Sequence, residues 1–221
     1  MSGQTSRGVF ITLEGGEGSG KSTVIQTLAS HLHEAGHDAL VTQEPEGTDL
    51  GRHIWAYFRE LAAAGSRVTA EAELFLFAAA RAEHVRTVIA PALDAGRIVL
   101  CDRFADSTTA YQGHGRGLDI ATVQAVNRTA IAGCEPDLTL LLDVPAEKGL
   151  RRARALETDA SKRPDAIGAE SRAFHDRVRA GFLTIAAANQ KRMLVIDATQ
   201  PLVDVCKQAI VLVGAYLNSR S

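Results

Sequence analysis

Hydrophobic residues along the chain form two alternating kinds of segment, short runs rich in β-branched residues and longer stretches with helical spacing. The short runs are apolar throughout, and polar or glycine-containing segments separate them from the longer stretches. Runs of this length and composition predict buried β-strands. The predicted strands are Val9–Leu13, Ala39–Thr42, Ile98–Cys101, Leu138–Val144 and Met193–Ile196.

The longer stretches place apolar residues three or four positions apart, which is the spacing of one face of an α-helix. Strands that are apolar throughout and separated by helices predict an α/β fold, a parallel five-stranded sheet with helices on both faces. The predicted helices are Ser22–Glu34, Leu50–Ala64, Thr69–Asp94, Asp119–Ala132, Ala146–Leu156, Glu170–Asn189 and Leu202–Leu217. No repeat or linker divides the chain, so residues 1–221 are predicted to form one domain.

The segment Glu157–Gly168 (ETDASKRPDAIG) is polar, contains both signs of charge and separates two predicted helices. Such a segment is most often a solvated connection. The alternative is a lid over an active site, which would span about residues 151–168. The pattern alone leaves both interpretations open.

Composition is that of an ordinary globular protein. The chain has 221 residues, 46% of them hydrophobic and 23% charged, and 24 Lys and Arg against 26 Asp and Glu give a formal net charge of −2. A nearly neutral chain without a basic tail is not typical of a protein that binds nucleic acid through its phosphates. Any anionic ligand must therefore meet locally placed cations.

The three cysteines, Cys101, Cys134 and Cys206, are an odd number without C-x-x-C spacing. The sequence therefore predicts neither a disulfide framework nor a zinc site, and favours a reducing compartment. No apolar run approaches the roughly 20 residues that span a bilayer, and the polar start does not resemble a signal peptide. These features predict a cytoplasmic protein without a membrane or nucleic-acid partner.

The segment from Gly15 to Ser22, GGEGSGKS, fits the phosphate-binding pattern G-x-x-x-x-G-K-[ST] and lies between a predicted strand and a predicted helix, as this pattern requires. Its glycines allow successive N–H groups to point at phosphate oxygens, next to the positive end of the helix. Lys21 would contact the β- and γ-phosphates, and the Ser22 hydroxyl would bind Mg²⁺. The residues predicted to bind ATP are Gly15, Gly16, Glu17, Gly18, Ser19, Gly20, Lys21, Ser22 and Thr23.

This phosphate loop alone does not distinguish an ATPase, a GTPase and a kinase. The N-K-x-D stretch typical of GTPase base recognition is absent from the sequence. A second acid is expected at the end of another core strand, and Asp102 follows the strand Ile98–Cys101. Asp102 is therefore a predicted magnesium ligand beside Arg103, which can contact phosphate, and an ion pair that merely ends the strand is the alternative.

Further cations lie in other predicted elements. Arg81 lies in a long helix, and a basic cluster surrounds the polar segment after residue 156. Phosphoryl transfer spreads negative charge over several oxygens, which cations from different elements can stabilise. The arrangement favours transfer to a second anionic substrate, although a solvated helix face explains the cluster equally well. The cluster consists of Arg151, Arg152, Arg154, Lys162 and Arg163.

The sequence DRFADSTTAYQG from Asp102 to Gly113 resembles the thymidylate kinase family, which is marked by D-R-[YFH], a small hydroxyl residue and A-Y-Q. The resemblance spans nearly the whole chain, with several further motifs in the order of the family. They are Phe10–Thr23, Glu44–Pro45 with Gly47–Thr48, Phe77–His84 (FAAARAEH), Pro136–Thr139 and Phe174–Gly181.

The resemblance implies a P-loop nucleoside monophosphate kinase fold with a short lid, a homodimer, and Mg²⁺-dependent transfer of the ATP γ-phosphate to dTMP. Phe77 would stack on the thymine ring, while Arg81 and Gln112 would hydrogen-bond its edge. Tyr111 would lie against the deoxyribose, and Glu17 would bind the 3′-hydroxyl. A flat aromatic face and a side-chain amide suit a pyrimidine.

For the acceptor phosphate and the metal, the resemblance implies that Arg103 contacts the phosphate and that Asp102 and Glu44 organise Mg²⁺. Thr108 would be the hydroxyl residue of the motif, near the substrate. Glu17, in a phosphate loop without a basic residue at its variable positions, resembles the bacterial subtype, in which lid arginines supply the catalytic cation. The catalytic residues would then be Lys21, Arg103, Arg154 and Arg163.

Four positions depart from the family pattern, and at the first of them Gln43 stands where arginine is common. Glu46 replaces a glycine of E-P-G-G-T, Trp55 replaces the arginine expected to contact the acceptor phosphate, and Ala166 replaces an arginine of the lid. Arg52 and Arg59 share a face with Trp55 if the segment is helical, so either can substitute. Arg52 is the predicted substrate ligand.

These departures leave three hypotheses open. The first is ATP-dependent phosphorylation of dTMP to dTDP with relocated arginines. The second is a kinase for a related or 5-modified pyrimidine monophosphate. The third is a nucleotide-binding pseudokinase, against which the intact Lys21, Ser22 and Asp102 argue.

Overall fold

The structure is a computed structural model that describes residues 7–156 and 170–220. Five parallel strands form one sheet in the order β2-β3-β1-β4-β5. They are β1 (Val9–Glu14), β2 (Ala39–Gln43), β3 (Ile98–Asp102), β4 (Leu138–Asp143) and β5 (Met193–Asp197). The predicted parallel five-stranded sheet is confirmed.

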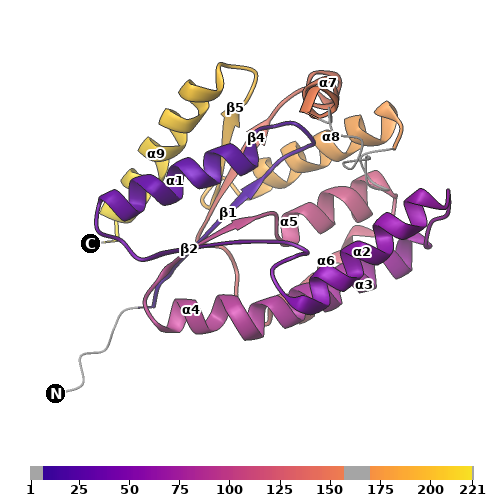
Figure 1. Cartoon of the computed structure of the whole chain (residues 1–221), viewed down its shortest axis with the longest axis horizontal. Coiled ribbons are helices and arrows are strands. Elements are labelled where there is room, and N and C mark those ends of the chain that lie inside the picture. Colours follow the sequence, from indigo (N-terminus) through magenta and orange to yellow (C-terminus); the bar gives the residue numbers. More distant parts are fainter. Residues whose placement is uncertain (1–6, 157–169, 221) are drawn as a thin grey trace.

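Helices cover both faces of this sheet, with α1 and α9 together on one side and α3, α4, α6 and α8 on the other (Figure 1). The α-helices are α1 (Lys21–Glu34), α2 (Asp49–Ala63), α3 (Ala70–His84), α4 (Ala90–Asp94), α5 (Ala105–Thr108), α6 (Ile120–Ile131), α7 (Ala146–Leu156), α8 (Arg172–Ala188) and α9 (Leu202–Asn218). Between α3 and α4 lies the π-helical segment η1 (Val85–Ile89), and α5 continues into the π-helical segment η2 (Thr109–Gly115). In the described part of the chain, no helix is both long and apolar enough to cross a membrane.

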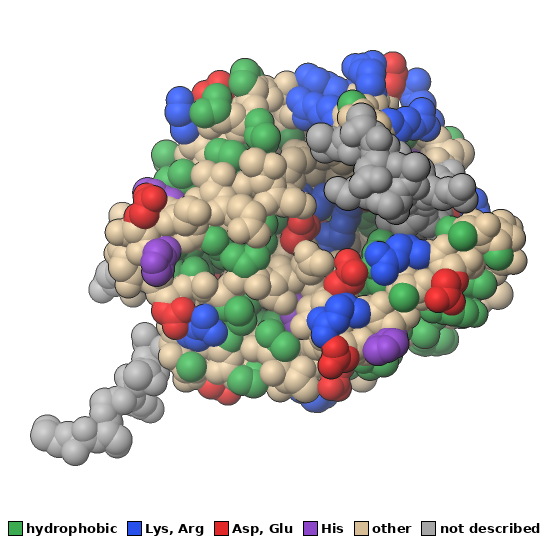
Figure 2. Space-filling view, in the orientation of Figure 1, with side chains coloured by type: hydrophobic (Ala, Val, Ile, Leu, Met, Phe, Trp, Pro, Cys, Tyr) green, Lys and Arg blue, Asp and Glu red, His purple; other side chains and the backbone are tan. Residues whose placement is uncertain are grey.

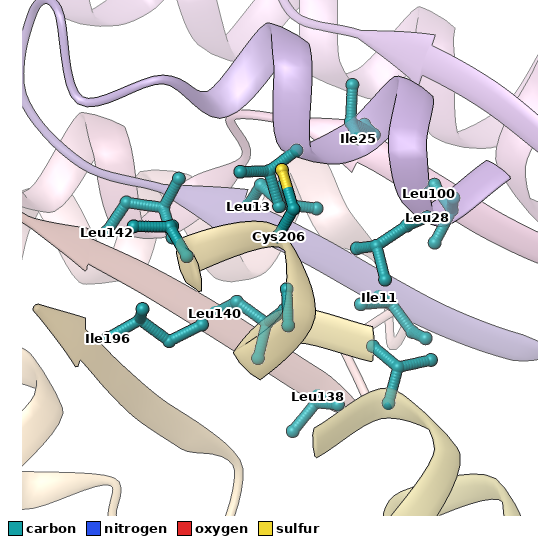
Figure 3. Packing of buried hydrophobic residues seen from close by; sticks show 14 of the residues in the cluster. Ile11, Leu13, Ile25, Leu28, Leu100, Leu138, Leu140, Leu142, Ile196 and Cys206 are labelled. Carbon is teal, nitrogen blue, oxygen red and sulfur yellow. The ribbon is translucent and has the colours of Figure 1, made fainter. Parts of the chain in front are cut away.

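One apolar core lies between the sheet and the pair α1 and α9 (Figure 3). Ile11 and Leu13 of β1 and Leu140 of β4 pack there with Leu28 of α1 and Cys206 of α9. Full burial of each large aliphatic side chain contributes about 2 kcal/mol of transfer free energy. This core therefore fixes β1, and with it the start of the phosphate loop.

The opposite face of the sheet packs against two other groups of helices. Phe10 of β1 packs against Ile89 of η1, while Phe182 of α8 packs against Leu141 of β4. The central strands are thus covered on both faces. This double burial is the physical reason that their sequences are apolar throughout.

The carboxyl ends of β1, β2 and β3 lie at one edge of the sheet, because the strands are parallel. Leu13 pairs with Asp102, which pairs in turn with Gln43. The predicted strands end one residue earlier, whereas the polar residues Glu14, Gln43 and Asp102 each still belong to a strand. Loops that follow neighbouring strands at this edge meet beside the phosphate loop, as ligand sites of open α/β sheets do.

The segment after β3 is helical, which the hydrophobic pattern did not predict. α5 and η2 cover it without interruption, although it contains two threonines and two glycines, which are weak helix formers. Packing against α8 overrides this local preference. A Cβ on Gly115 would lie 2.8 Å from side-chain atoms of Phe174 and Val178, so glycine permits the close approach of η2 to α8.

Candidate active site

A cavity of about 400 Å³ opens at the carboxyl edge of the sheet. Figure 2 shows a hollow on this face, with acidic and basic side chains at its floor and basic side chains gathered over α7. Small-molecule sites have this range of volume and this mixture of apolar and placed polar groups. The predicted site residues that line the cavity are Glu17, Gly18, Ser19, Gly20, Lys21, Ser22, Thr23, Glu44, Phe77, Arg81, Asp102, Arg103, Thr108, Tyr111 and Gln112.

The phosphate loop surrounds the ammonium group of Lys21. Its Nζ donates to the carbonyl oxygens of Gly15 and Gly16, both at 3.1 Å, and to Ser19 Oγ at 3.3 Å. Gly15 and Gly16 are thus behind the lysine rather than on the cavity wall. Burial lowers the pKa of Lys21, and the nearby charge of Arg103 acts in the same direction. An anionic ligand would offset both effects.

The phosphate loop also packs directly against α7. A Cβ on Gly18 would lie 2.1 Å from the carbonyl oxygen of Gly149, and one on Gly149 would lie 2.2 Å from that of Glu17. Gly18 has a φ of 63°, a region that favours glycine. α7 is therefore held beside the loop, with Ala153 on the cavity wall and Arg154 exposed next to it.

Ser22 and Asp102 supply two oxygen atoms beside the phosphate loop. Ser22 Oγ donates to Asp102 Oδ2 at 3.2 Å. Hydroxyl and carboxylate oxygens suit Mg²⁺, which is usually held by one or two side chains together with substrate phosphates and water. Among the described residues, no three His, Cys, Asp or Glu side chains form a metal site by themselves. The pair therefore fits a magnesium ion that arrives with a nucleotide.

Glu44, the third predicted magnesium ligand, is held by other side chains. Arg81 donates to Glu44 Oε2 from Nε at 2.9 Å and from Nη2 at 2.7 Å. His84 Nδ1 lies 3.3 Å from Glu44 Oε1 and Thr42 Oγ1 lies 2.7 Å from His84 Nε2. Both carboxylate oxygens are therefore engaged within the protein.

Arg103 follows β3 and lies between Glu17 and Tyr111 at the cavity wall. It donates from Nη2 to Glu17 Oε1 at 2.7 Å, and its guanidinium carbon is 5.1 Å from the centroid of the Tyr111 ring. The Tyr111 hydroxyl donates to the same Glu17 oxygen at 3.1 Å. Burial raises the pKa of Glu17, but the charges of Arg103 and Lys21 outweigh burial and hold that pKa below its usual value. Glu17 is thus an anionic acceptor for a hydroxyl group.

Glu14, which sequence reasoning missed, fixes the backbone after β3 from below the cavity. It is fully buried and accepts hydrogen bonds from Phe104 N at 2.8 Å, Ser107 N at 3.2 Å and Ser107 Oγ at 2.6 Å. Arg103 has a φ of 69°, which is uncommon for a residue with a side chain. Burial raises the pKa of Glu14 to about 8, and the charge of Asp106 adds to this effect. Its signal in the sequence was a carboxylate at the end of an apolar strand.

The far end of the cavity is aromatic. Phe77 stacks on the buried Phe58 with ring centroids 5.0 Å apart and an interplanar angle of 21°. The Trp55 ring lies 6.4 Å from that of Phe77, and both rings line the cavity. The departure from the family pattern at position 55 thus contributes an apolar ring to this wall, a surface that suits a flat base.

Arg81 and Gln112 line the same end with polar groups that the protein already holds. Besides its contacts with Glu44, Arg81 donates from Nη1 to Asn127 Oδ1 at 2.9 Å. Gln112 Nε2 donates to Glu73 Oε1 at 2.7 Å. Neither Asn127 nor Glu73 was predicted, because a polar residue within a helix has no sequence signal for contact with a distant segment.

Other predicted residues lie elsewhere. Arg52 is exposed on α2, pairs with Asp49 and donates to Glu46 O at 3.3 Å, and it does not line the cavity. Arg59 is exposed on the same helix. Arg163, Ala166 and the predicted lid beyond residue 156 lie outside the described residues.

Comparisons with known proteins agree with these features. The thymidylate kinase family model matches residues 13–210. The thymidylate kinase of Desulfovibrio desulfuricans is 47% identical over 214 residues, which cover 96% of this chain and 98% of that protein. The thymidylate kinase of Nitratidesulfovibrio vulgaris is 48% identical over 215 residues, 96% of this chain and 95% of that protein. The thymidylate kinase of Thermomicrobium roseum is 50% identical over 192 residues, which cover 87% of this chain and 88% of that protein.

Proposed function

The chain belongs to the thymidylate kinase family, and we propose on this basis that it transfers the γ-phosphate of ATP to dTMP and forms dTDP. One observation supports this function above all. The phosphate loop, the Arg103–Glu17–Tyr111 group and the aromatic wall at Phe77 open into the same cavity. A nucleoside monophosphate that spans these three places would present its phosphate to a phosphate held by the loop.

The chemical step needs positioning and charge more than acid–base catalysis. A phosphate oxygen of dTMP would attack the γ-phosphorus of ATP, and the bond to the β-γ bridging oxygen would break, leaving ADP. No general base is required, because the acceptor phosphate is already an anion. Lys21 would stabilise the charge on the transferred group, and Arg103 would position the acceptor phosphate after exchanging part of its contact with Glu17.

Mg²⁺ would bind at Ser22 and Asp102, where it would neutralise charge on the phosphates of ATP. Glu44 would act on the metal only through water, because Arg81 and His84 already engage both of its oxygens. ATP and Mg²⁺ are thus the expected nucleotide and metal.

The acceptor would meet the remaining residues in order along the cavity. Phe77 would stack on the base, Arg81 and Gln112 would contact its edge, and Tyr111 and Thr108 would lie near the sugar, whose 3′-hydroxyl would donate to Glu17. Arg52 would reach the acceptor phosphate only by leaving Asp49.

Arginines near residues 151–168 would supply the remaining cation, because the phosphate loop has no basic residue at its variable positions. Arg154 at the end of α7 and Arg163 are the proposed residues. We further propose that residues 1–221 act as one domain with this segment as its lid.

The proposed function is tested by ADP production with ATP, Mg²⁺ and dTMP, dUMP, dCMP, UMP or AMP, beside a control without acceptor. We expect selective turnover of dTMP. A preference for another monophosphate would replace the proposed substrate. Binding of ATP without turnover of any acceptor would indicate a pseudokinase.

A homodimer is proposed through a groove between α3 and α6. Phe75 is 58% exposed there beside Ala78, Ala79, Val126 and Ala130. Small side chains around an exposed aromatic ring allow the helices of a second copy to approach closely. Phe75→Glu should give a monomer by light scattering. The control Val211→Glu, at a 66% exposed site on α9, should leave a dimer.

The protein is proposed to function in the cytoplasm. Cys101, Cys134 and Cys206 are all buried free thiols, as a reducing compartment permits.

A further inference from the structure

Glu73 is a buried carboxylate that the proposed phosphate transfer does not use. It lies on α3, is 5% exposed and does not line the cavity. Its neighbour Gln112, which donates to it from Nε2 at 2.7 Å, does line the cavity. A buried charge is costly unless it is paired and hydrogen-bonded, so the partners of Glu73 define what it can do.

Arg116 holds both oxygens of this carboxylate. It donates from Nε to Glu73 Oε1 at 3.1 Å and from Nη2 to Glu73 Oε2 at 2.9 Å. On its other side Arg116 pairs with Glu170, and its guanidinium carbon lies 4.7 Å from the ring centroid of Phe174. A carboxylate paired in this way with a guanidinium accepts hydrogen bonds and has none to donate.

This pairing determines which end of the Gln112 amide faces Glu73. A side-chain amide donates from its nitrogen and accepts at its oxygen, and the two ends have nearly the same shape. Since Glu73 only accepts, the nitrogen must face Glu73 and the oxygen must face away from it. Among the described residues, none donates a hydrogen bond to Gln112 Oε1. The site therefore offers a ligand an acceptor whose orientation is fixed.

A fixed acceptor distinguishes between pyrimidines at ring position 3. Thymine and uracil have an N–H there, which can donate to Gln112 Oε1. Cytosine has an unprotonated nitrogen at this position, whose lone pair would face the amide oxygen. If the amide could rotate by 180°, it would instead offer its N–H to cytosine, and the selectivity for thymine over cytosine would fall.

We propose that Glu73 is a positioning residue that fixes the orientation of the Gln112 amide and thereby makes the site select pyrimidine monophosphates with an N–H at ring position 3. The inference rests on the proposed function, because it requires Gln112 to contact the base. Glu73 itself does not touch the substrate.

The test is kcat/KM for dTMP, dUMP and dCMP with the wild type, Glu73→Gln and the control Glu170→Gln. Glutamine at position 73 can accept or donate, so the Gln112 amide can take both orientations. We expect the dTMP to dCMP ratio to fall about 10-fold in Glu73→Gln, the scale of one hydrogen bond. The dTMP to dUMP ratio should not change, because both bases have the N–H. Glu170→Gln also removes a carboxylate from Arg116 but does not touch Gln112, and it should change neither ratio.

A merely structural role for Glu73 would lower kcat/KM for all three acceptors alike, and unchanged ratios would overturn the proposal. Should Glu73→Gln fail to fold, Glu73→Met removes the acceptor with an apolar side chain of similar length, so nothing fixes the orientation of the Gln112 amide. The dTMP to dCMP ratio should again fall about 10-fold, and an unchanged ratio would overturn the proposal.

The same measurements distinguish failure of the proposed kinase activity from failure of the proposed role of Glu73. A wild type that turns over none of these acceptors would contradict the kinase activity but not the role of Glu73. Calorimetric binding of dTMP and dCMP to the wild type and Glu73→Gln would then test the role of Glu73. The ratio of the two dissociation constants should change between these proteins as predicted for the ratio of kcat/KM values. A wild type that binds neither monophosphate would overturn both proposals.

Discussion

At the phosphate side of the cavity, the consecutive residues Gly15–Thr23 supply backbone groups, a lysine and a hydroxyl from the loop after β1 and the first turn of α1. At the base side, Trp55, Phe77, Arg81 and Gln112 come from α2, α3 and η2, far apart along the sequence. The polar side chains on the base side are held by buried partners, Glu44, Asn127 and Glu73, rather than by the backbone of their own segment. One contiguous segment can therefore supply the groups that bind phosphate, whereas the groups that would select a base come together only in the assembled fold.

The largest expected effect lies on the phosphate side. Lys21→Met should lower kcat about 10³-fold, because it removes the ammonium group that the loop holds for the transferred phosphate. Steady-state ADP production with dTMP measures this loss. Lys207→Met, an exposed lysine paired with Asp204 on α9, is the control and should retain full activity. A loss of less than tenfold in Lys21→Met would show that the loop backbone alone suffices.

The second-largest effect is expected from the arginines beside the phosphate loop. One of the variants Arg154→Ala and Arg163→Ala should have a turnover number about 10²- to 10³-fold below that of the wild type, because its arginine is the catalytic one. This is the scale for loss of a charge-stabilising donor. Arg151, exposed on the same helix and paired with Glu147, is the matched control. Pre-steady-state phosphoryl transfer measures the chemical step directly. Activity retained in both Arg154→Ala and Arg163→Ala would remove these arginines from the mechanism.

A smaller effect on the base side sharpens the comparison. Trp55→Ala should raise KM for dTMP about tenfold and leave kcat nearly unchanged, because an aromatic wall binds ground state and transition state alike. Tyr57→Ala, at a 46% exposed ring of the same helix, should leave both constants unchanged. If Trp55→Arg instead raises kcat, position 55 belongs to the phosphate side, and the comparison fails there.

The smallest expected effect on turnover belongs to Glu14→Gln, whose main consequence is for stability. The pKa of Glu14 is raised from 4.5 to about 8 by burial, so the folded chain keeps a proton that the unfolded chain releases above pH 4.5. The free energy of unfolding should therefore fall by a few kcal/mol as pH rises from 4.5 to 8. Glutamine keeps the hydrogen bonds of the protonated carboxyl, so this slope should disappear in the variant.

Urea denaturation of the wild type and Glu14→Gln between pH 5 and pH 8.5 measures the slope. Glu60→Gln removes an exposed carboxyl of α2 and should keep the slope of the wild type. Equal slopes in Glu14→Gln and the wild type would assign the pH dependence to other groups.

The sequence predicted correctly those features that the residues of a single segment form by themselves. The apolar runs identified all five strands, and the glycines before Lys21 identified the phosphate loop, because both patterns follow from contacts between near neighbours. β1 and β3 each end one residue beyond their apolar runs, because Glu14 pairs with Leu141 and Asp102 pairs with Leu13. The family resemblance implied that Tyr111 and Gln112 belong to the site, and both line the cavity, but it did not predict the helical segment η2 that carries them.

Helix-face spacing was less informative at Arg52. Residues three apart share a helix face, yet only Trp55 turns to the cavity, whereas Arg52 stays exposed beside Asp49. The rotation of α2 about its axis depends on packing of Ile54 and Phe58 against α3, which no local pattern contains.

By itself, the sequence determined the family, the parallel sheet and the phosphate loop, because these depend on periodicity and on contiguous residues. The tertiary structure decided that α5 and η2 are helical, that Glu14 supports the turn at Arg103, and that Glu73 orients Gln112. Each of these features joins residues about 40 to 90 positions apart or depends on close packing with α8. Burial makes such distant pairings necessary, since a buried polar group must find its partner wherever the fold brings one.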